Sequence, residues 1–260
     1  MHIANLPSVK FFKMKKALVT GASTGIGLVF CKELRNEGWE VTGVARSEEK
    51  LKEEFDDGYF IATDLSSEQG ISLLEKHLKE NKYDLLINNA GFGLYRKFME
   101  APIEPQVDMM HLNVEALVRL SYAFLATAKK GDALMNVSSA VALLPMPGAA
   151  VYSATKSFVT SFSECLWYEH KDKGIYVFAA SPGAVITPFH ENAGGDSKKM
   201  DSGMVMTAEY MVGEALKTLK ARKKPSYIIG NQYRFITKIT QLFPRTFRLK
   251  QLAKKSQGIN

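Results

Sequence analysis

The chain has 260 residues, 46% of them apolar and 23% charged, which is typical of a globular protein with one large α/β domain or two small ones. No apolar run reaches the roughly 18 residues of a membrane span, so an integral membrane protein is not expected. The two cysteines, Cys31 and Cys165, are far apart and form no CxxC or Cys/His cluster, which argues against a disulfide framework and a zinc site. We therefore expect no metal and a reducing, cytoplasmic location.

The chain divides into three parts by composition. Residues 1–13 precede Met14, which opens a sequence typical of a natural start, and they lack the apolar core of a signal peptide. We expect a disordered extension there. Residues 14–230 carry one continuous pattern without linkers or repeats and form the predicted catalytic domain. Residues 231–260 form a basic, amphipathic C-terminal extension.

Short apolar runs alternate with helical patterns along the domain. The predicted strands are 16–20, 40–45, 59–62, 84–88, 133–138, 175–180 and 227–230. The predicted helices are 25–37, 48–55, 67–80, 104–129, 150–171 and 207–222, followed by 231–255 with an interruption at Pro244. This alternation predicts an α/β fold, a doubly wound parallel sheet with helices on both faces.

A glycine-rich turn follows the first strand. Gly21, Gly25 and Gly27 stand between residues 16–20 and the first helix, in a TGxxxGxG spacing. Backbone N–H groups and a helix N-terminus in this context can hold a pyrophosphate. The alternative is a sharp strand–helix turn without a ligand.

The end of the second strand bears on which dinucleotide would bind. NAD sites place a carboxylate there, whereas NADP sites need positive charge for the 2′-phosphate. The chain has Ala45 followed by Arg46 and no acid, so NADP(H) is expected in preference to NAD(H). The alternative is that Arg46 is a solvated residue at the start of a helix.

Polar residues follow the third and fourth strands and interrupt the long helix. Asp64 could accept a hydrogen bond from adenine, or it could cap the next turn. Asn89 and Gly91 stand in a small, polar NNAG turn that suits close passage of a ligand. Asn113 is a poor interior helix residue, so it is expected to make a polar bond, either structural or within a water relay.

A serine, a tyrosine and a lysine form the candidate catalytic group. Tyr152 and Lys156, four residues apart, share one face of a helix, and an adjacent ammonium should lower the tyrosine pKa. Ser139 follows the fifth strand, where its hydroxyl could polarise a carbonyl. A lone Tyr-x-x-x-Lys pair is usually ordinary helix surface, so this reading depends on the other motifs. The turn formed by residues 181–188 could form one side of a nicotinamide site, and the segment 189–206 is a candidate substrate lid.

Taken together, these motifs resemble the short-chain dehydrogenase/reductase family, over residues 15–230. The resemblance implies strand order 3-2-1-4-5-6-7. It implies that Tyr152 is the general acid/base, that Lys156 binds the nicotinamide ribose, that Ser139 orients the substrate oxygen and that Asn113 supports a relay water. The cofactor residues it implies are Gly21, Ser23, Thr24, Gly25, Ile26, Gly27, Arg46, Asp64, Leu65, Asn89, Ala90, Gly91, Tyr152, Lys156, Pro182, Gly183, Val185 and Thr187.

The expected function is NADPH-dependent hydride transfer to or from the carbonyl or secondary alcohol of a small, apolar or acyl-type substrate. One alternative is a membrane- or carrier-protein-associated scaffold with little turnover. An epimerase or dehydratase on the same fold is a further one. A homodimer through helices 104–129 and 150–171, or a homotetramer, is expected, although the tail departs from the pattern of tetrameric relatives. No nucleic-acid partner is expected.

Charge is concentrated at the C-terminal end. Residues 215–260 contain twelve Lys/Arg and no Asp/Glu, whereas the remainder contains 22 basic and 27 acidic residues. The simpler interpretation is a solvated helical surface. The other is a patch for an anionic partner, which makes 231–255 a candidate contact with a membrane or an acidic protein.

Overall fold

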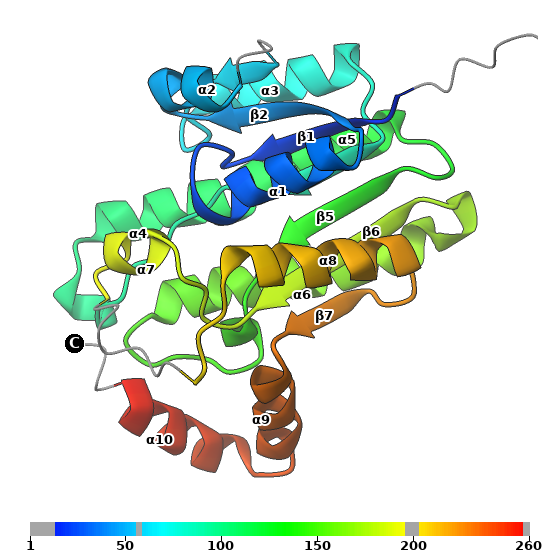
Figure 1. The fold of residues 1–260 in the computed structure, drawn as a ribbon. Coiled ribbons are helices and arrows are strands. Elements are labelled where there is room, and N and C mark those ends of the chain that lie inside the picture. The colour runs from blue at the N-terminus through cyan, green and yellow to red at the C-terminus, as the bar shows by residue number, and fades with distance from the viewer. Residues whose placement is uncertain (1–13, 56–58, 196–202, 257–260) are drawn as a thin grey trace, which may run out of the picture.

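A single parallel sheet organises the chain (Figure 1). The computed structural model describes residues 14–55, 59–195 and 203–256, so the extension expected at 1–13 lies outside the described residues. The strands are β1 (Lys16–Thr20), β2 (Glu40–Ala45), β3 (Phe60–Ala62), β4 (Leu85–Asn88), β5 (Ala133–Val137), β6 (Tyr176–Pro182) and β7 (Ser226–Ile229). Their order, β3-β2-β1-β4-β5-β6-β7, confirms the predicted fold class.

Successive residues of each strand enter different cores, because side chains alternate across a sheet. Val19 of β1 belongs to the cluster on one face, and the preceding Leu18 belongs to the cluster on the other. In β6, Phe178 and Val177 divide in the same way. Both faces are covered, which explains why the strands read as continuous apolar runs rather than alternating ones.

Helices cover both faces. They are α1 (Gly25–Asn36), α2 (Glu48–Glu54), α3 (Glu68–Glu80), α4 (Ile103–Met110), α5 (Leu117–Thr127), α6 (Ala150–His170), α7 (Phe189–Asn192), α8 (Ala208–Ala221), α9 (Asn231–Gln241) and α10 (Arg245–Ser256). Short 3₁₀ turns lie at η1 (Phe98–Glu100), η3 (Ala140–Ala142) and η4 (Lys171–Lys173). Helices α1 and α8 pack together on one face, in front in Figure 1, and α3 packs with α5 on the other.

The long helix predicted at 104–129 is not uniform. It runs as α4, then the π-helical segment η2 (His111–Ala116), then α5, and it ends at Thr127. The widened turn contains Asn113, the residue that fits an α-helix poorly. The long helix is therefore present as predicted apart from its last two residues, but its π-helical segment, where Asn113 donates to Phe92 and Thr155, was not expected.

The C-terminal helices extend away from the sheet. β7 leads directly into α9, and Pro244 separates α9 from α10, as the sequence predicted. Figure 1 shows both helices beyond the last strand, below the rest of the molecule in that view. Within the described ranges, none of the helices combines the length and apolar character needed to span a bilayer.

Candidate functional site

Two strand ends are tied together at the centre of the sheet. The Thr20 hydroxyl, at the end of β1, accepts hydrogen bonds from the backbone N–H groups of Asn89 and Ala90, both at 3.0 Å. The Asn89 amide in turn donates to the Thr20 carbonyl at 3.0 Å. The turn after β4 is thus fixed against the turn after β1. Thr20 was not singled out from the sequence, although a polar residue ending an apolar strand was a usable signal.

The glycine turn leaves no room for side chains. Gly21 has φ +69°, a left-handed conformation that favours glycine. A Cβ atom on Gly27 would lie 2.1 Å from the Gly21 carbonyl oxygen and 2.6 Å from the Asn89 amide nitrogen. The turn after β1, the first turn of α1 and Asn89 therefore lie in direct contact.

The start of α1 has the electrostatics of an anion site. Its N-cap residue, Thr24, makes no side-chain cap hydrogen bond, and the first turn contains no acidic residue. The N–H groups there and the positive end of the helix dipole suit a phosphate. Across the turn lies Thr187, whose side chain would be 3.3 Å from a Cβ atom on Gly25. The segment after β6 thus lies against the glycine turn.

The other predicted cofactor residues lie at the carboxyl ends of the strands. Arg46 is exposed directly after β2. Asp64, after β3, accepts from the Ser66 N–H at 2.9 Å and from the Ser66 hydroxyl at 2.7 Å, so one carboxylate oxygen caps the turn. Leu65 is buried beside Thr20 and Ala90. Ser23, Thr24 and Ile26 stand in the glycine turn, and Pro182, Gly183 and Val185 follow or end β6.

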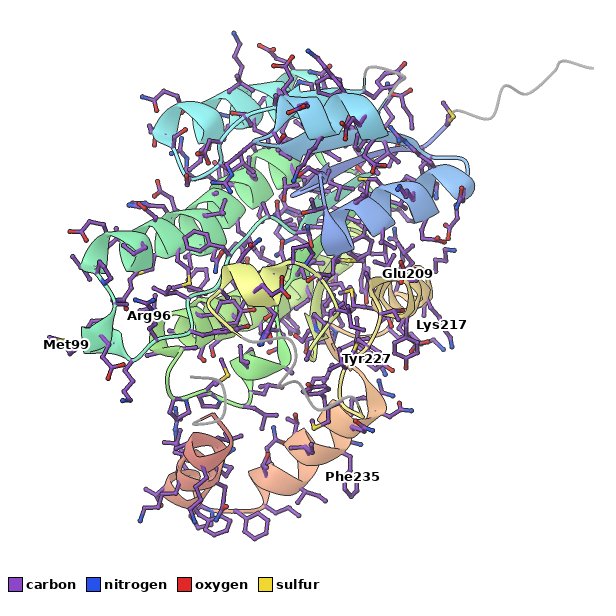
Figure 2. The ribbon with its side chains drawn as sticks, turned by 60° about the vertical axis from the view of Figure 1, so that its left-hand side comes forward. Arg96, Met99, Glu209, Lys217, Tyr227 and Phe235 are labelled. Atoms are coloured by element: carbon purple, nitrogen blue, oxygen red, sulfur yellow. The ribbon has the colours of Figure 1, made fainter. Side chains whose placement is uncertain are left out.

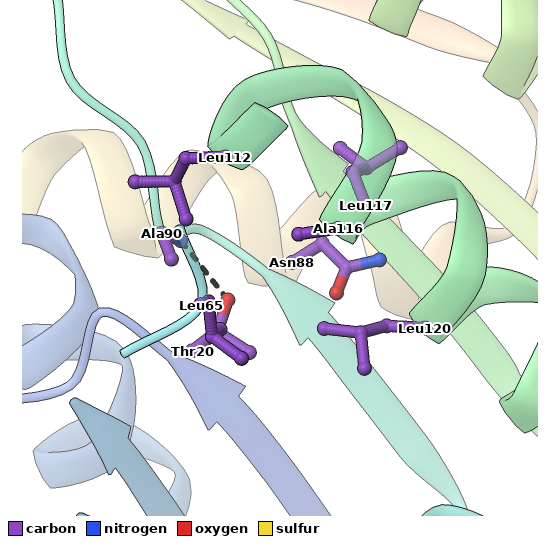
Figure 3. A pocket seen from close by; sticks show the side chains of 8 residues that line it. All are labelled: Thr20, Leu65, Asn88, Ala90, Leu112, Ala116, Leu117 and Leu120. Atoms are coloured by element: carbon purple, nitrogen blue, oxygen red, sulfur yellow. Dashed lines mark hydrogen bonds between the residues drawn. The ribbon is translucent and has the colours of Figure 1, made fainter. Parts of the chain in front are cut away.

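A small pocket lies between β1, β4 and the π-helical segment (Figure 3). It is lined by Thr20, Leu65, Asn88, Ala90, Leu112, Ala116, Leu117 and Leu120. The Asn88 amide nitrogen donates to Ser121 and Asn136, while its oxygen has no hydrogen-bond partner among the described residues. The rest of the lining is mainly apolar, so this pocket lacks the polar groups of a reaction site.

The predicted catalytic residues come together at the end of β5. Tyr152 and Lys156, on α6, are each only 6% exposed. The Lys156 ammonium lies 5.9 Å from the centre of the Tyr152 ring and donates to the Val137 carbonyl at 2.9 Å. Ser139 makes a side-chain hydrogen bond with Tyr152. The neighbouring Ser138 instead bonds the Lys156 carbonyl at 2.8 Å, which fixes α6 on the strand.

The expected lowering of the tyrosine pKa is wrong in this structure. Burial raises the pKa of Tyr152, the nearby Tyr95 phenol adds to the increase, and the Ser139 hydrogen bond opposes it. Burial also lowers the pKa of Lys156 to about 8. Desolvation disfavours the charged form of both groups, and it outweighs the attraction that their spacing suggested.

Asn113 acts as a bridge in this structure. Its side-chain amide donates to the Phe92 carbonyl at 2.9 Å and to the Thr155 hydroxyl at 3.2 Å, and its oxygen accepts from the Phe92 N–H at 3.1 Å. A Cβ atom on Gly91 would lie 2.7 Å from that oxygen and 3.6 Å from the Lys156 ammonium. The π-helical segment, the turn after β4 and α6 are thereby held together. Asn113 thus makes the structural hydrogen bonds that were one of its two expected roles, and its part in a water relay stays a prediction.

An aromatic wall lies beside Tyr152, and its members Tyr95 and His190 were missed from the sequence. The Tyr95 ring lies 6.0 Å from the Tyr152 ring and 5.2 Å from the His190 ring, centre to centre, and Phe189 lies 5.8 Å from Tyr152. Phe92, Leu94, Tyr95, Val141, Met146, Val151 and Phe189 pack around it. The predicted lid thus begins with α7 over the tyrosine, while residues 196–202, including Met200, lie outside the described residues.

The fold and this site define a dinucleotide-binding α/β protein with a tyrosine–lysine centre. The profile of the short chain dehydrogenase family matches residues 15–198. The chain belongs to that family, and it is an oxidoreductase of the short-chain dehydrogenase/reductase type.

Two relatives and two solved structures illustrate the similarity. A very-long-chain 3-oxoacyl-CoA reductase from Mus musculus is 31% identical over 90% of this chain and 77% of its own. A 17-beta-hydroxysteroid dehydrogenase type 3 from Mus musculus is 30% identical over 77% of this chain and 68% of its own. The structure of a short-chain dehydrogenase from Sphingobium yanoikuyae in complex with NADPH superposes with a TM-score of 0.78 at 28% identity, covering 88% and 94% of the two chains. A bulky-bulky ketone specific alcohol dehydrogenase from Comamonas testosteroni gives a TM-score of 0.73 at 26% identity, covering 88% and 92%.

Proposed function

We propose that this oxidoreductase is an NADPH-dependent reductase of apolar ketones or 3-oxoacyl compounds, with Tyr152 as the proton donor. The observation that carries the proposal is the placement of Tyr152, Ser139 and Lys156 together at the end of β5. The glycine groove lies at the same edge of the sheet, two strands away.

The chain's residues fit a dinucleotide at that groove. The contact between Gly27 and Gly21 gives a bare backbone surface, and the uncapped start of α1 offers N–H groups to a pyrophosphate. Exposed Arg46, after an alanine, suits the 2′-phosphate of NADP(H). Asp64 has one carboxylate oxygen in a turn, which leaves the other for the adenine side. When bound, the nicotinamide supplies or accepts the hydride.

Tyr152 is suited to the proton half of the reaction. Because burial raises its pKa, the phenol is protonated near neutral pH and can donate to a carbonyl oxygen that gains a hydride. Ser139, which bonds the phenol, would orient that oxygen. Lys156 stands behind the ring and would bind the ribose of the nicotinamide half. These roles favour carbonyl reduction as the direction at neutral pH.

The substrate class follows from the walls beside Tyr152. Tyr95, Phe189 and Met146 pack in the cluster that includes it, and the described lining has few charged groups. Such a wall favours an apolar body next to the reacting carbonyl. Two relatives named for 3-oxoacyl-CoA and hydroxysteroid substrates support the same class. We place acyl thioesters and steroid ketones ahead of sugars.

The test combines a substrate panel with a single-atom substitution. NADPH absorbance is followed with ketones, 3-oxoacyl thioesters, steroids and sugars, for wild type and for Tyr152→Phe. We expect a loss of turnover of at least about a hundredfold with NADPH binding retained. Tyr168→Phe, an exposed tyrosine on the same helix, is the matched control and should keep wild-type turnover. Unchanged turnover in Tyr152→Phe would remove the proton-donor role, and no turnover of wild type on any class would favour the scaffold alternative.

We also propose that two copies of the enzyme pair through α4, α5 and α6. Ile103, Val107 and Met110 recur along α4 and are 55%, 39% and 51% exposed. On α6, the rings of Phe158 and Phe162 stack 5.7 Å apart, and Phe158 is 41% exposed. Sedimentation equilibrium of wild type and Val107→Asp tests this pairing, and a monomeric wild type would contradict it.

A reducing cytoplasmic location is proposed from the free thiols of Cys31 and Cys165.

A further inference from the structure

Helix α9 has large apolar residues on its outer side as well as on its inner side. Thr237 faces the protein, is 3% exposed, and has a hydroxyl without a hydrogen-bond partner among the described residues. Phe235 and Ile239, on the outer side, are 65% and 38% exposed, and Leu242, just after the helix, is 82% exposed. Spacings of four and three place these three side chains in one stripe. The outer side of a surface helix in a globular protein is normally polar.

The apolar surface continues onto the next helix. Phe243 and Phe247 pack against each other with ring centres 5.2 Å apart, and each is 45% exposed. Figure 2 shows Phe235 projecting from the outer side of α9, at the end of the molecule farthest from α3. We call these five side chains (Phe235, Ile239, Leu242, Phe243 and Phe247) the C-terminal apolar surface. The helical spacing of the first three, the sequence neighbours Leu242 and Phe243, and the ring contact of the last two group these side chains at one end of the chain.

Positive charge surrounds this surface. Residues 231–256 contain seven Lys/Arg and no Asp/Glu. Lys238, Arg245, Lys250 and Lys254 are exposed. Arg234 is held by the protein itself, because it donates to the Ile228 carbonyl at 3.0 Å and lies over the Tyr227 ring. The exposed Lys and Arg side chains thus lie next to the apolar stripe, as on helices that lie at membrane surfaces.

The charge distinguishes between possible partners. A second copy joined by a two-fold axis would place the same basic residues against each other, which is repulsive. A nucleic acid would pair with the cations but would leave the large apolar side chains exposed to water. An anionic bilayer satisfies both features, since the headgroups attract the cations and the headgroup–acyl boundary accepts aromatic and aliphatic side chains.

We infer that α9 and α10 dock this enzyme on an anionic membrane surface through the C-terminal apolar surface. The docking does not depend on the proposed reaction. It does place the active-site region beside the bilayer, because the inner side of α9 contacts the turn after β6. A Cβ atom on Gly183 would lie 2.0 Å from the Tyr233 ring, and Tyr233 also contributes to the raised pKa of Tyr95 in the aromatic wall.

Vesicle flotation of the full chain tests the inference. Vesicles of phosphatidylcholine alone are compared with vesicles that also contain phosphatidylserine. We expect binding to the mixed vesicles that weakens with added salt, and much weaker binding to phosphatidylcholine alone. Phe235→Ser and Leu242→Ser should each weaken binding at least about tenfold. Lys238→Gln and Lys250→Gln should each weaken it about fivefold.

Matched substitutions elsewhere control for general effects. Met99→Ser and Leu73→Ser change side chains that are 88% and 50% exposed, and Lys76→Gln and Lys79→Gln change exposed lysines on α3. These variants should float as wild type does, and thermal melting should show that all variants are folded. The inference would be overturned if wild type bound neither kind of vesicle. It would also be overturned if the double variant Phe235→Ser/Leu242→Ser bound as wild type does. A dimer in solution that this double substitution dissociates would overturn it in favour of contact between copies.

Discussion

The Lys156 ammonium lies 5.9 Å from the centre of the Tyr152 ring, and both side chains are almost completely buried. Its hydrogen bond to the Val137 carbonyl fixes it beside the phenol, and no acidic side chain among the described residues forms an ion pair with it. In this environment the neutral phenol is favoured, and charging the lysine is costly. The Tyr152 phenol therefore keeps its proton, and the Lys156 amine beside it has a lowered pKa.

Replacing Lys156 by Met should flatten the pH dependence of stability in the alkaline range. The pKa of Lys156 is about 8 in the folded protein, whereas that of an unfolded lysine is about 10.4. Between these values the unfolded chain binds more protons, so the free energy of unfolding falls as the pH decreases from about 10.4 to about 8. The fall is on the order of 3 kcal/mol in wild type and is complete below that window.

Urea unfolding across this pH window measures the effect. Lys217→Met, whose side chain is exposed on α8, is the control and should keep the wild-type dependence. The raised pKa of Tyr152 acts in the opposite sense, but only above about pH 10. A Lys156→Met variant with the wild-type pH dependence would contradict the assignment of the depressed pKa.

Gly27→Ala should weaken cofactor binding and destabilise the protein. The added Cβ atom would lie 2.1 Å from the Gly21 carbonyl, so the glycine turn or the start of α1 must move. Overpacking of this kind costs about 1–3 kcal/mol. Gly213→Ala on α8 is the matched control, since nothing lies within 4 Å of its Cβ position. It should stabilise the protein by about 0.5–1 kcal/mol, because alanine is the better helix former. Thermal melting and NADPH titration of both variants check the pair.

Arg46→Asp should move the preference from NADPH toward NADH. A carboxylate after β2 would repel a 2′-phosphate and could accept from a ribose hydroxyl. The ratio of kcat/KM values for the two cofactors is the measurement, and we expect it to change at least about tenfold. Since Arg46 is exposed, stability should be within about 0.5 kcal/mol of wild type. A ratio that does not change would favour the interpretation of Arg46 as a solvated residue.

Asn113→Ala should destabilise the protein by about 1–3 kcal/mol, because it leaves the partly buried N–H and C=O groups of Phe92 without these partners. Differential scanning calorimetry is suitable for the comparison. Asn81→Ala, at the exposed end of α3, should change stability by less than about 0.5 kcal/mol. If the two variants were equally stable, Asn113 would not be the bridge described here.

The strands and the groove were predictable because their signals are local. The run Ala17–Val19 reads as a buried strand wherever both faces of a sheet are covered, and the glycines after it stand in a fixed spacing. Asn113 was marked as unusual for the same reason, since asparagine is disfavoured inside helices. The π-helical segment itself was not predictable, because it depends on the distant carbonyl of Phe92 and hydroxyl of Thr155.

The aromatic wall and the tyrosine pKa depend on contacts between distant segments. Tyr95 and His190 are 95 residues apart in the chain, and only the packing of α7 brings their rings within 5.2 Å. The spacing of Tyr152 and Lys156 indicated attraction between them. It contained no information on burial, which is produced by α7, the turn after β4 and the neighbouring Tyr95. The sign of the pKa shift was therefore wrong for a physical reason that sequence spacing cannot reveal.

The hydrogen bonds between Thr20 and Asn89 have a consequence for how tightly a ligand can bind. They join two strand ends that are 69 residues apart, and they do so within the protein itself. The turns after β1 and β4 are consequently fixed by bonds within the protein, so little conformational entropy should be lost there when a dinucleotide binds. Selectivity among dinucleotides should then come from groups at the rim of the groove, whereas these fixed turns contribute affinity common to all of them.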